Sequence, residues 1–142
     1  MGLDIANGNV NRNITLAGTS IAIFTFLLFF LYPRYLSGEI NAILFQFTLA
    51  IIVSVIFSLV ISALYYYGTV LTMSLPPEKV RVATIFGKAE AFWLVGYSLL
   101  LLEPSLILFT INLSVVGSYA LVLWFSYLFL TGLQFRRQTK RK

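Results

Sequence analysis

The chain has 142 residues, of which 59% are hydrophobic and only 11% charged. Soluble domains carry about 25% charged residues, so this chain lacks the polar side chains to cover a water-soluble core of its size. The sequence contains no His and no Cys, which excludes imidazole catalysis, thiolate nucleophiles, disulfides, iron–sulfur clusters and metal sites with His or Cys ligands. We therefore predict an integral membrane protein without a cofactor, a metal site or a catalytic constellation.

The positive charge is concentrated at the carboxyl end. The formal net charge is +5, from ten basic and five acidic residues. Half of the basic residues fall in the last seven positions, and these are Arg136, Arg137, Lys140, Arg141 and Lys142. Nucleic-acid binding needs basic residues spread over a folded face, so no nucleic-acid partner is expected. We predict that residues 136–142 form a basic cytoplasmic tail that binds anionic lipids, with about 1 kcal/mol from each basic residue near the surface.

The amino half contains a polar segment and two apolar runs. Residues 1–13 are polar and rich in Asn, and we expect them to precede a membrane domain at residues 14–135. The run at about 14–32 lacks the basic start and the cleavage site of a signal peptide, so it predicts an uncleaved transmembrane helix. The run at about 42–75 would make roughly 51 Å of helix. Since the hydrocarbon layer is about 30 Å thick, we expect this helix to project beyond it.

The carboxyl half of the apolar sequence can be divided in two ways. Pro76-Pro77-Glu78 is typical of a helix start. A turn at Glu103-Pro104 would then give helices at about 78–102 and 105–135, whereas a hairpin around Asn112–Gly117 would leave Glu103 inside the third span. An acid near the bilayer centre costs about 2.5–3.5 kcal/mol, and the residue before a proline avoids the helical region. We therefore favour the turn, with Glu103 solvated; inside the span it would be a candidate proton or cation site, or the partner of a basic residue in another subunit.

These spans predict an all-α fold, a four-helix antiparallel membrane bundle whose helices two to four project on the cytoplasmic side. Four spans place both termini on one side of the membrane. The positive-inside rule makes that side cytoplasmic, because the basic tail follows the last span directly.

Small residues recur at helical spacing on three of the predicted helices. The second helix carries a row at intervals of four residues, and shorter pairs occur on the first and fourth helices. These residues are Gln46, Ala50, Ser54, Ser58 and Ser62, then Gly18 and Ala22, then Ser114 and Ser118. Small residues at this spacing let helix backbones approach closely, which predicts packing inside the bundle or against a partner. A row of Ser and Gln can also line a water-filled path in an oligomer.

The function expected from these patterns is that of a non-catalytic membrane subunit with a structural or assembly role. Such a subunit lies in the lipid bilayer and packs against other membrane chains or against itself. The alternative is a homo-oligomeric channel, or a transporter of a small solute or ion, with the second helix lining the path. The two differ in whether the protein assembles with unlike chains or forms a symmetric homo-oligomer.

Overall fold

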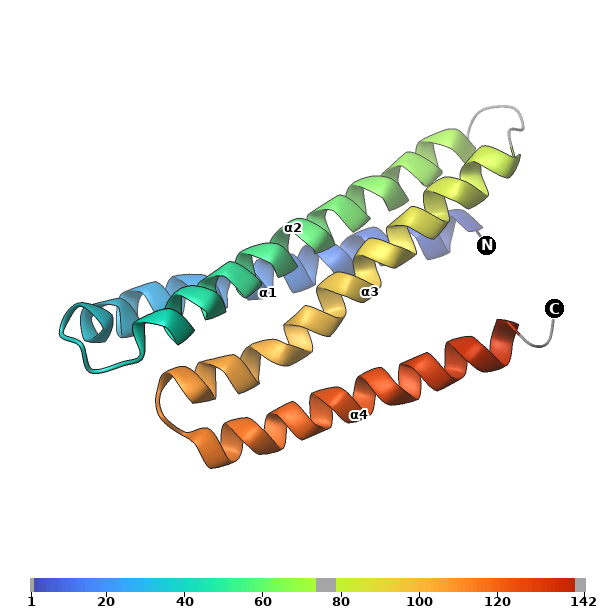
Figure 1. Cartoon of the computed structure of the whole chain (residues 1–142). Coiled ribbons are helices and arrows are strands. Elements are labelled where there is room, and N and C mark those ends of the chain that lie inside the picture. Colours follow the sequence, from blue (N-terminus) through green and yellow to red (C-terminus); the bar gives the residue numbers. More distant parts are fainter. Residues whose placement is uncertain (1, 74–78, 140–142) are drawn as a thin grey trace.

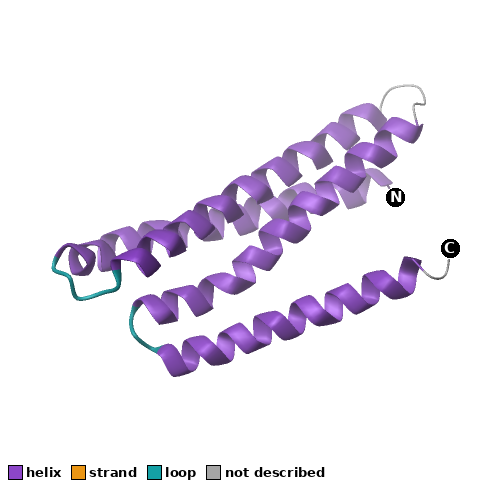
Figure 2. Cartoon of the chain, viewed as in Figure 1, coloured by secondary structure: helices purple, strands orange, loops and turns teal. Residues whose placement is uncertain are grey.

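The computed structural model describes residues 2–73 and 79–139, and the surroundings of the side chains at 4–71 and 82–133. These residues form four helices, which are α1 (Gly2–Leu36), α2 (Ala42–Met73), α3 (Lys79–Thr110) and α4 (Ser114–Thr139). Figure 2 shows the two described connections between them, at residues 37–41 and 111–113. Both connections lie at the same end of the molecule, opposite the start of α1 and the end of α4 (Figure 1).

Each of the four helices is long and apolar enough to cross a membrane. The apolar spans are Asp4–Leu36, Ala42–Leu71, Val82–Thr110 and Ser114–Leu133, and the shortest has 20 residues. A bilayer span needs about 20 residues of helix. The structure thus confirms the expectation of an all-α, multi-pass membrane protein built as a helix bundle.

The predicted turn at Glu103-Pro104 is wrong, because α3 continues through both residues to Thr110. The expected bounds 78–102 and 105–135 are therefore wrong as well, and the chain turns at 111–113, as in the alternative division. Proline is tolerated inside membrane helices where neighbouring groups satisfy the backbone it leaves free. The prediction failed because it assumed that the Glu103 side chain would be exposed to lipid, which is energetically costly. In the structure this side chain is buried between helices.

The turn after α3 is a Schellman motif. Asn112 has a φ of 63°, in the left-handed region that Asn tolerates better than most residues. The Leu113 N–H donates to the Leu108 carbonyl at 2.9 Å and the Asn112 N–H to the Phe109 carbonyl at 3.1 Å, which are the two bonds of this helix end. Gly38, with a φ of 76°, ends α1 in the same way, since the Glu39 N–H donates to the Arg34 carbonyl at 3.0 Å.

α1 begins at Gly2 and ends at Leu36, so residues 2–13 are part of the first helix rather than a separate segment, and the expected bounds 14–32 are too short. Ala6 and Asn13 have no exposed surface, and packing of this kind stabilises a helix more than residue propensity does. α2 begins at Ala42 as predicted, with the Leu44 N–H donating to Asn41 Oδ1 at 3.0 Å. Its predicted end at residue 75 lies outside the described residues.

α2 is the central helix of the bundle. It packs against α1 and α3, while α4 packs against α3 (Figure 1). The buried positions recur every seven residues, which is the period of left-handed helix packing. On α2 they are Phe45, Ile52, Leu59 and Tyr66, with Thr48, Val55, Ser62 and Thr69; on α1 they are Ala6, Asn13, Ser20 and Leu27; on α3 they are Ala89, Gly96, Glu103 and Thr110.

The apolar interior consists of two clusters at different heights along these helices. The first apolar layer contains Ala17, Val55 and Leu59, with Leu16, Trp93, Leu99 and Leu100 packed against them. The second apolar layer contains Leu27, Leu31, Ile40, Phe45 and Ile52, together with Ile23, Phe24, Tyr35, Leu49, Ile56, Ile107 and Ile111. Polar residues occupy most of the remaining buried positions of the seven-residue repeats, and Ala6, Ala89 and Gly96 occupy the others.

Candidate functional site in the buried polar groups

The predicted row on α2 is divided between the interior and the outer surface of the bundle. Ser62 is fully buried. Ser58 is half-buried and lies so close to α3 that a Cβ on Gly96 would be 3.1 Å from the Ser58 Cβ. The other members, Gln46, Ala50 and Ser54, are exposed. A spacing of four drifts away from a seam with a period of 3.5, so the buried part of the row is its end at Ser58 and Ser62. Among the exposed members, Gln46 Nε2 donates to the Tyr35 hydroxyl on α1 at 3.0 Å.

The small residues predicted on α1 and α4 are all exposed. A Cβ on Gly18 would meet nothing within 4 Å, and Ala22, although exposed, lines a groove between α1 and α3. Ser114 and Ser118 are exposed on α4. In the predicted tail, the side chains of Arg136 and Arg137 and the whole of Lys140, Arg141 and Lys142 lie outside the described residues.

A chain of hydrogen bonds connects α1, α2 and α3 inside the bundle. Asn13 Nδ2 donates to Ser62 Oγ at 2.8 Å, and the Ser62 hydroxyl donates to the carbonyl oxygen of Ala89 at 2.7 Å. Asn13 and Ser62 have no exposed surface. In a bilayer such bonds between helices contribute up to about 1–2 kcal/mol each, and Ser62 is the member of the predicted row that connects α1, α2 and α3 through buried bonds.

Charged and aromatic side chains extend this network. The hydroxyl of Tyr66 on α2, a fully buried residue, donates to Glu90 on α3. From α1, the Arg12 guanidinium lies 4.3 Å from the centre of the Trp93 ring, a cation–π contact that contributes about 0.5–2 kcal/mol. Arg12 and Glu90 thus add one basic and one acidic side chain to the network, and we call Arg12, Tyr66, Glu90 and Trp93, together with Asn13 and Ser62, the terminal polar cluster.

Glu103 is the second buried polar feature. It is 1% exposed, and neither carboxylate oxygen has a hydrogen-bond partner. The residue lies inside the apolar span Val82–Thr110. Burial of an ionised carboxylate without a partner costs several kcal/mol, so this position is either neutral or bound to a cation. The structure therefore agrees with the alternative reading of the sequence, in which Glu103 lies within the membrane-spanning segment.

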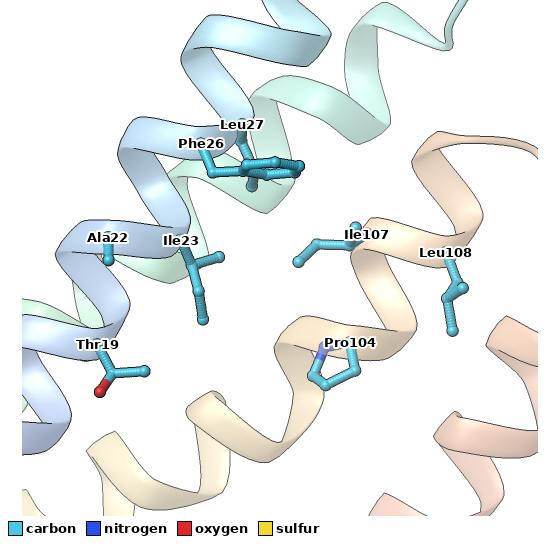
Figure 3. Close-up of a pocket in the computed structure, with 8 residues that line it drawn as sticks. All are labelled: Thr19, Ala22, Ile23, Phe26, Leu27, Pro104, Ile107 and Leu108. Atoms are coloured by element: carbon cyan, nitrogen blue, oxygen red, sulfur yellow. The ribbon is translucent and has the colours of Figure 1, made fainter.

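An apolar groove of about 560 Å³ lies between α1 and α3, and its lining includes Pro104, the residue that follows Glu103. Figure 3 shows Thr19, Ala22, Ile23 and Phe26 of α1 facing Pro104 and Ile107 of α3 across it. Leu27 and Leu108 complete the lining. Two of the lining residues, Thr19 and Pro104, directly adjoin the buried residues Ser20 and Glu103.

This chain matches no known protein family, no curated protein sequence and no solved structure. Its chemistry must therefore be read from its own residues. Among the described residues, no three acidic side chains come together in a way that could hold a metal ion. The buried oxygen atoms can accept hydrogen bonds or bind one small cation, and the terminal polar cluster can fix the relative positions of three helices.

Sequence reasoning missed most of the buried polar residues. Asn13 forms part of an apparent glycosylation sequon, Ser20 has no unusual local context, and Thr48 and Thr110 are separated by 62 positions although their hydroxyl groups lie 3.1 Å apart. The signal that could have found them is the seven-residue spacing on each helix, which joins Asn13 to Ser20 and Glu103 to Thr110. The prediction instead rested on the row on α2 with a spacing of four residues, from Gln46 to Ser62, and did not consider the spacing of seven.

Proposed function

We propose that this protein is a non-catalytic membrane subunit that packs against another membrane chain. The observation that supports this is the outward position of the small residues. Gly18, Ala22, Ala50, Ser54 and Ser118 are exposed on the bundle. In a bilayer, helices associate chiefly through close packing of small residues, and an exposed row of them is suited to contact with another helix rather than with lipid.

The sparse packing of α4 supports the same proposal. Only 6% of the most apolar part of its span is buried within the chain, against 33% for α2. α4 is held to α3 by few contacts, among them the bond from Trp124 Nε1 to the Ser98 carbonyl at 2.8 Å and that from Ser105 Oγ to the Gly117 carbonyl at 2.8 Å. A partner chain would bury more of α4 against protein.

The orientation in the membrane is part of this proposal. The four helices cross in alternating directions, as an antiparallel bundle, and both termini lie in the cytoplasm. The support is the basic run Arg136–Lys142, since basic residues next to a span favour the cytoplasmic side. In this orientation the ends of α2, α3 and α4 project on the cytoplasmic side, and the basic tail contacts anionic lipid headgroups.

Cross-linking in the native membrane tests the packing proposal, and the Cys-free sequence gives it no background. Ala50→Cys and Ser54→Cys should cross-link to a neighbouring chain. Phe57→Cys is the control, because Phe57 is 62% exposed on the same helix but is a bulky side chain outside the row. Cross-linking that is absent at all three positions, together with a monomeric mass by native mass spectrometry, would contradict the proposal.

The masses of the cross-linked products separate the proposal from its alternative. Unlike partners support a subunit of a larger complex. A symmetric homo-oligomer that also conducts ions in liposomes would favour the channel or transporter with α2 lining the path. Only the exposed half of the α2 row is free to line such a path, because Ser58 and Ser62 contact other helices of the same chain.

A further inference from the structure

Among the described residues, Glu103 and Ser20 are fully buried side chains whose polar atoms all lack a hydrogen-bond partner. Glu103 is 1% exposed and both of its carboxylate oxygens lack a hydrogen bond, and Ser20 has no exposed surface while its hydroxyl also lacks one. Hydroxyl groups in helices usually bond to the carbonyl four residues earlier, as Thr19 and Thr25 do here. The Ser20 hydroxyl is therefore available for another ligand, and a buried polar group without a partner points to an ion or water.

The two side chains lie in the same cross-section of the bundle. On α1, Ser20 lies between Ala17 of the first apolar layer and Ile23 of the second. On α3, Glu103 lies between Leu100 of the first layer and Ile107 of the second. Ser20 on α1 and Glu103 on α3 therefore lie at the same height, at the boundary between the first and the second apolar layer.

Within residues 4–71 and 82–133, no charged side chain lies near this level to neutralise Glu103. On α1 the nearest charges to Ser20 are Arg12, eight residues and about 12 Å of helix away, and Arg34, fourteen residues and about 21 Å away. On α3 the nearest charge to Glu103 is Glu90, thirteen residues and about 20 Å away. The spans of α2 and α4 contain no Asp, Glu, Lys or Arg. A small cation is thus the remaining way to compensate a carboxylate here.

Pro104 adds a further oxygen and a route of access. Proline has no N–H, so the carbonyl of Leu100 receives no helical hydrogen bond from residue 104. Leu100 belongs to the first apolar layer, beside this level. The groove between α1 and α3 reaches the same height, because Thr19 and Pro104 line it (Figure 3). A small apolar reagent can therefore approach from the lipid.

We propose that Glu103 and Ser20 form a binding site inside the membrane for one small cation, either a proton or a sodium ion. The carboxylate supplies the charge, and the Ser20 hydroxyl and the Leu100 carbonyl supply neutral oxygen atoms, the ligand type that hard cations prefer. This site lies within one chain and does not depend on the packing proposed above.

Labelling with dicyclohexylcarbodiimide tests the site on the full-length protein. This apolar reagent adds to a protonated carboxyl group in a membrane and leaves a stable N-acylurea, which peptide mass spectrometry locates. The protein in liposomes is treated between about pH 5 and pH 8, where folded proteins tend to be most stable, with NaCl or with choline chloride. We expect Glu103 to be labelled. A rate that falls as the pH rises but ignores Na⁺ identifies a proton site, and a rate that Na⁺ slows relative to choline identifies a sodium site.

Two variants connect the label to the proposed geometry. Glu103→Gln should abolish labelling at this position. Ser20→Ala should shift the pH that halves the rate by about one unit, or the Na⁺ concentration that halves it by about tenfold, the effect of one hydrogen bond to a charged group. Ser126→Ala is the matched control, because the Ser126 hydroxyl is exposed and bonds to the Val122 carbonyl at 2.9 Å. Circular dichroism in detergent verifies that each variant is folded. Absence of labelling at Glu103 in the folded wild-type protein would overturn the proposal, and so would a rate unaffected by pH, Na⁺ and Ser20→Ala.

Discussion

Gly96→Ala probes a close approach between α2 and α3. A Cβ on Gly96 would lie 3.1 Å from Leu59 Cγ, Leu59 Cδ2 and Ser58 Cβ. Carbon atoms in contact prefer about 3.5–4.0 Å, so these atoms would have to move by roughly 0.4–0.9 Å. Leu59 is fully buried and the Ser58 Cβ is attached to the backbone, so α2 and α3 must separate locally. Overpacking of this kind costs about 1–3 kcal/mol.

Gly87→Ala is the matched control on the same helix, because a Cβ on Gly87 would meet nothing within 4 Å. Replacement of Gly by Ala inside a helix stabilises it by about 1 kcal/mol, and this gain is common to both variants. The free energy of unfolding, measured by titration with a denaturing detergent and followed by circular dichroism, should therefore be lower for Gly96→Ala than for Gly87→Ala by about 1–3 kcal/mol. Equal free energies of unfolding in the two variants would refute the close contact between α2 and α3.

Three further predictions concern the hydrogen bonds, the turn and the topology. Ser62→Ala should lower the free energy of unfolding by about 1–3 kcal/mol because it leaves Asn13 Nδ2 without its partner and removes the additional bond to the Ala89 carbonyl. Ser54→Ala should change it by less than about 0.5 kcal/mol; the same denaturation assay decides, and equal effects would count against the terminal polar cluster. Asn112→Val should lower the melting temperature while Asn112→Gly does not, since a β-branched residue is strained at a φ of 63°; equal melting temperatures would contradict the Schellman turn. Ser37→Cys and Thr139→Cys should react with an impermeant thiol reagent from opposite sides of the membrane, and reaction from the same side would contradict four crossings.

The membrane class, the number of helices and the start of α2 could be predicted from the sequence. The apolar runs can be counted along the sequence, and the scarcity of charged residues follows from the composition. The capping residue Asn41 could be read in the same way, because its side chain bonds to Leu44 three positions later. These features depend on residues only a few positions apart in the chain, so they can be read from the sequence.

The division of the carboxyl half was not predictable by the same reasoning. The cost of placing Glu103 in a membrane depends on whether the side chain meets lipid or the interior of the bundle, and that is decided by α1 and α2. The left-handed residue at the true turn, Asn112, is a weaker local signal than a Glu-Pro pair. Tertiary packing therefore outweighed the two local rules that favoured a turn at Glu103-Pro104.

The candidate site was predictable only in part. Ser62 and Glu103 were among the predicted residues, but the partners of Ser62 and the position of Ser20 depend on which faces of three helices meet. A row with a spacing of four and a seam with a spacing of seven share few positions, so the row could identify only one end of the seam. The exposed members Ala50 and Ser54 remain a prediction about contact with another chain.

The position of Glu103 inside the bundle is the central structural claim, and thiol accessibility tests it most directly. Glu103→Cys and Ser114→Cys are introduced separately into the Cys-free chain and treated with a membrane-impermeant maleimide on each side of intact vesicles. We predict that the variant at Ser114, the exposed first residue of α4, reacts from one side. The variant at Glu103 should react from neither side. Rapid reaction at position 103 with protection at position 114 would contradict the continuous helix α3 and return the turn to Glu103-Pro104.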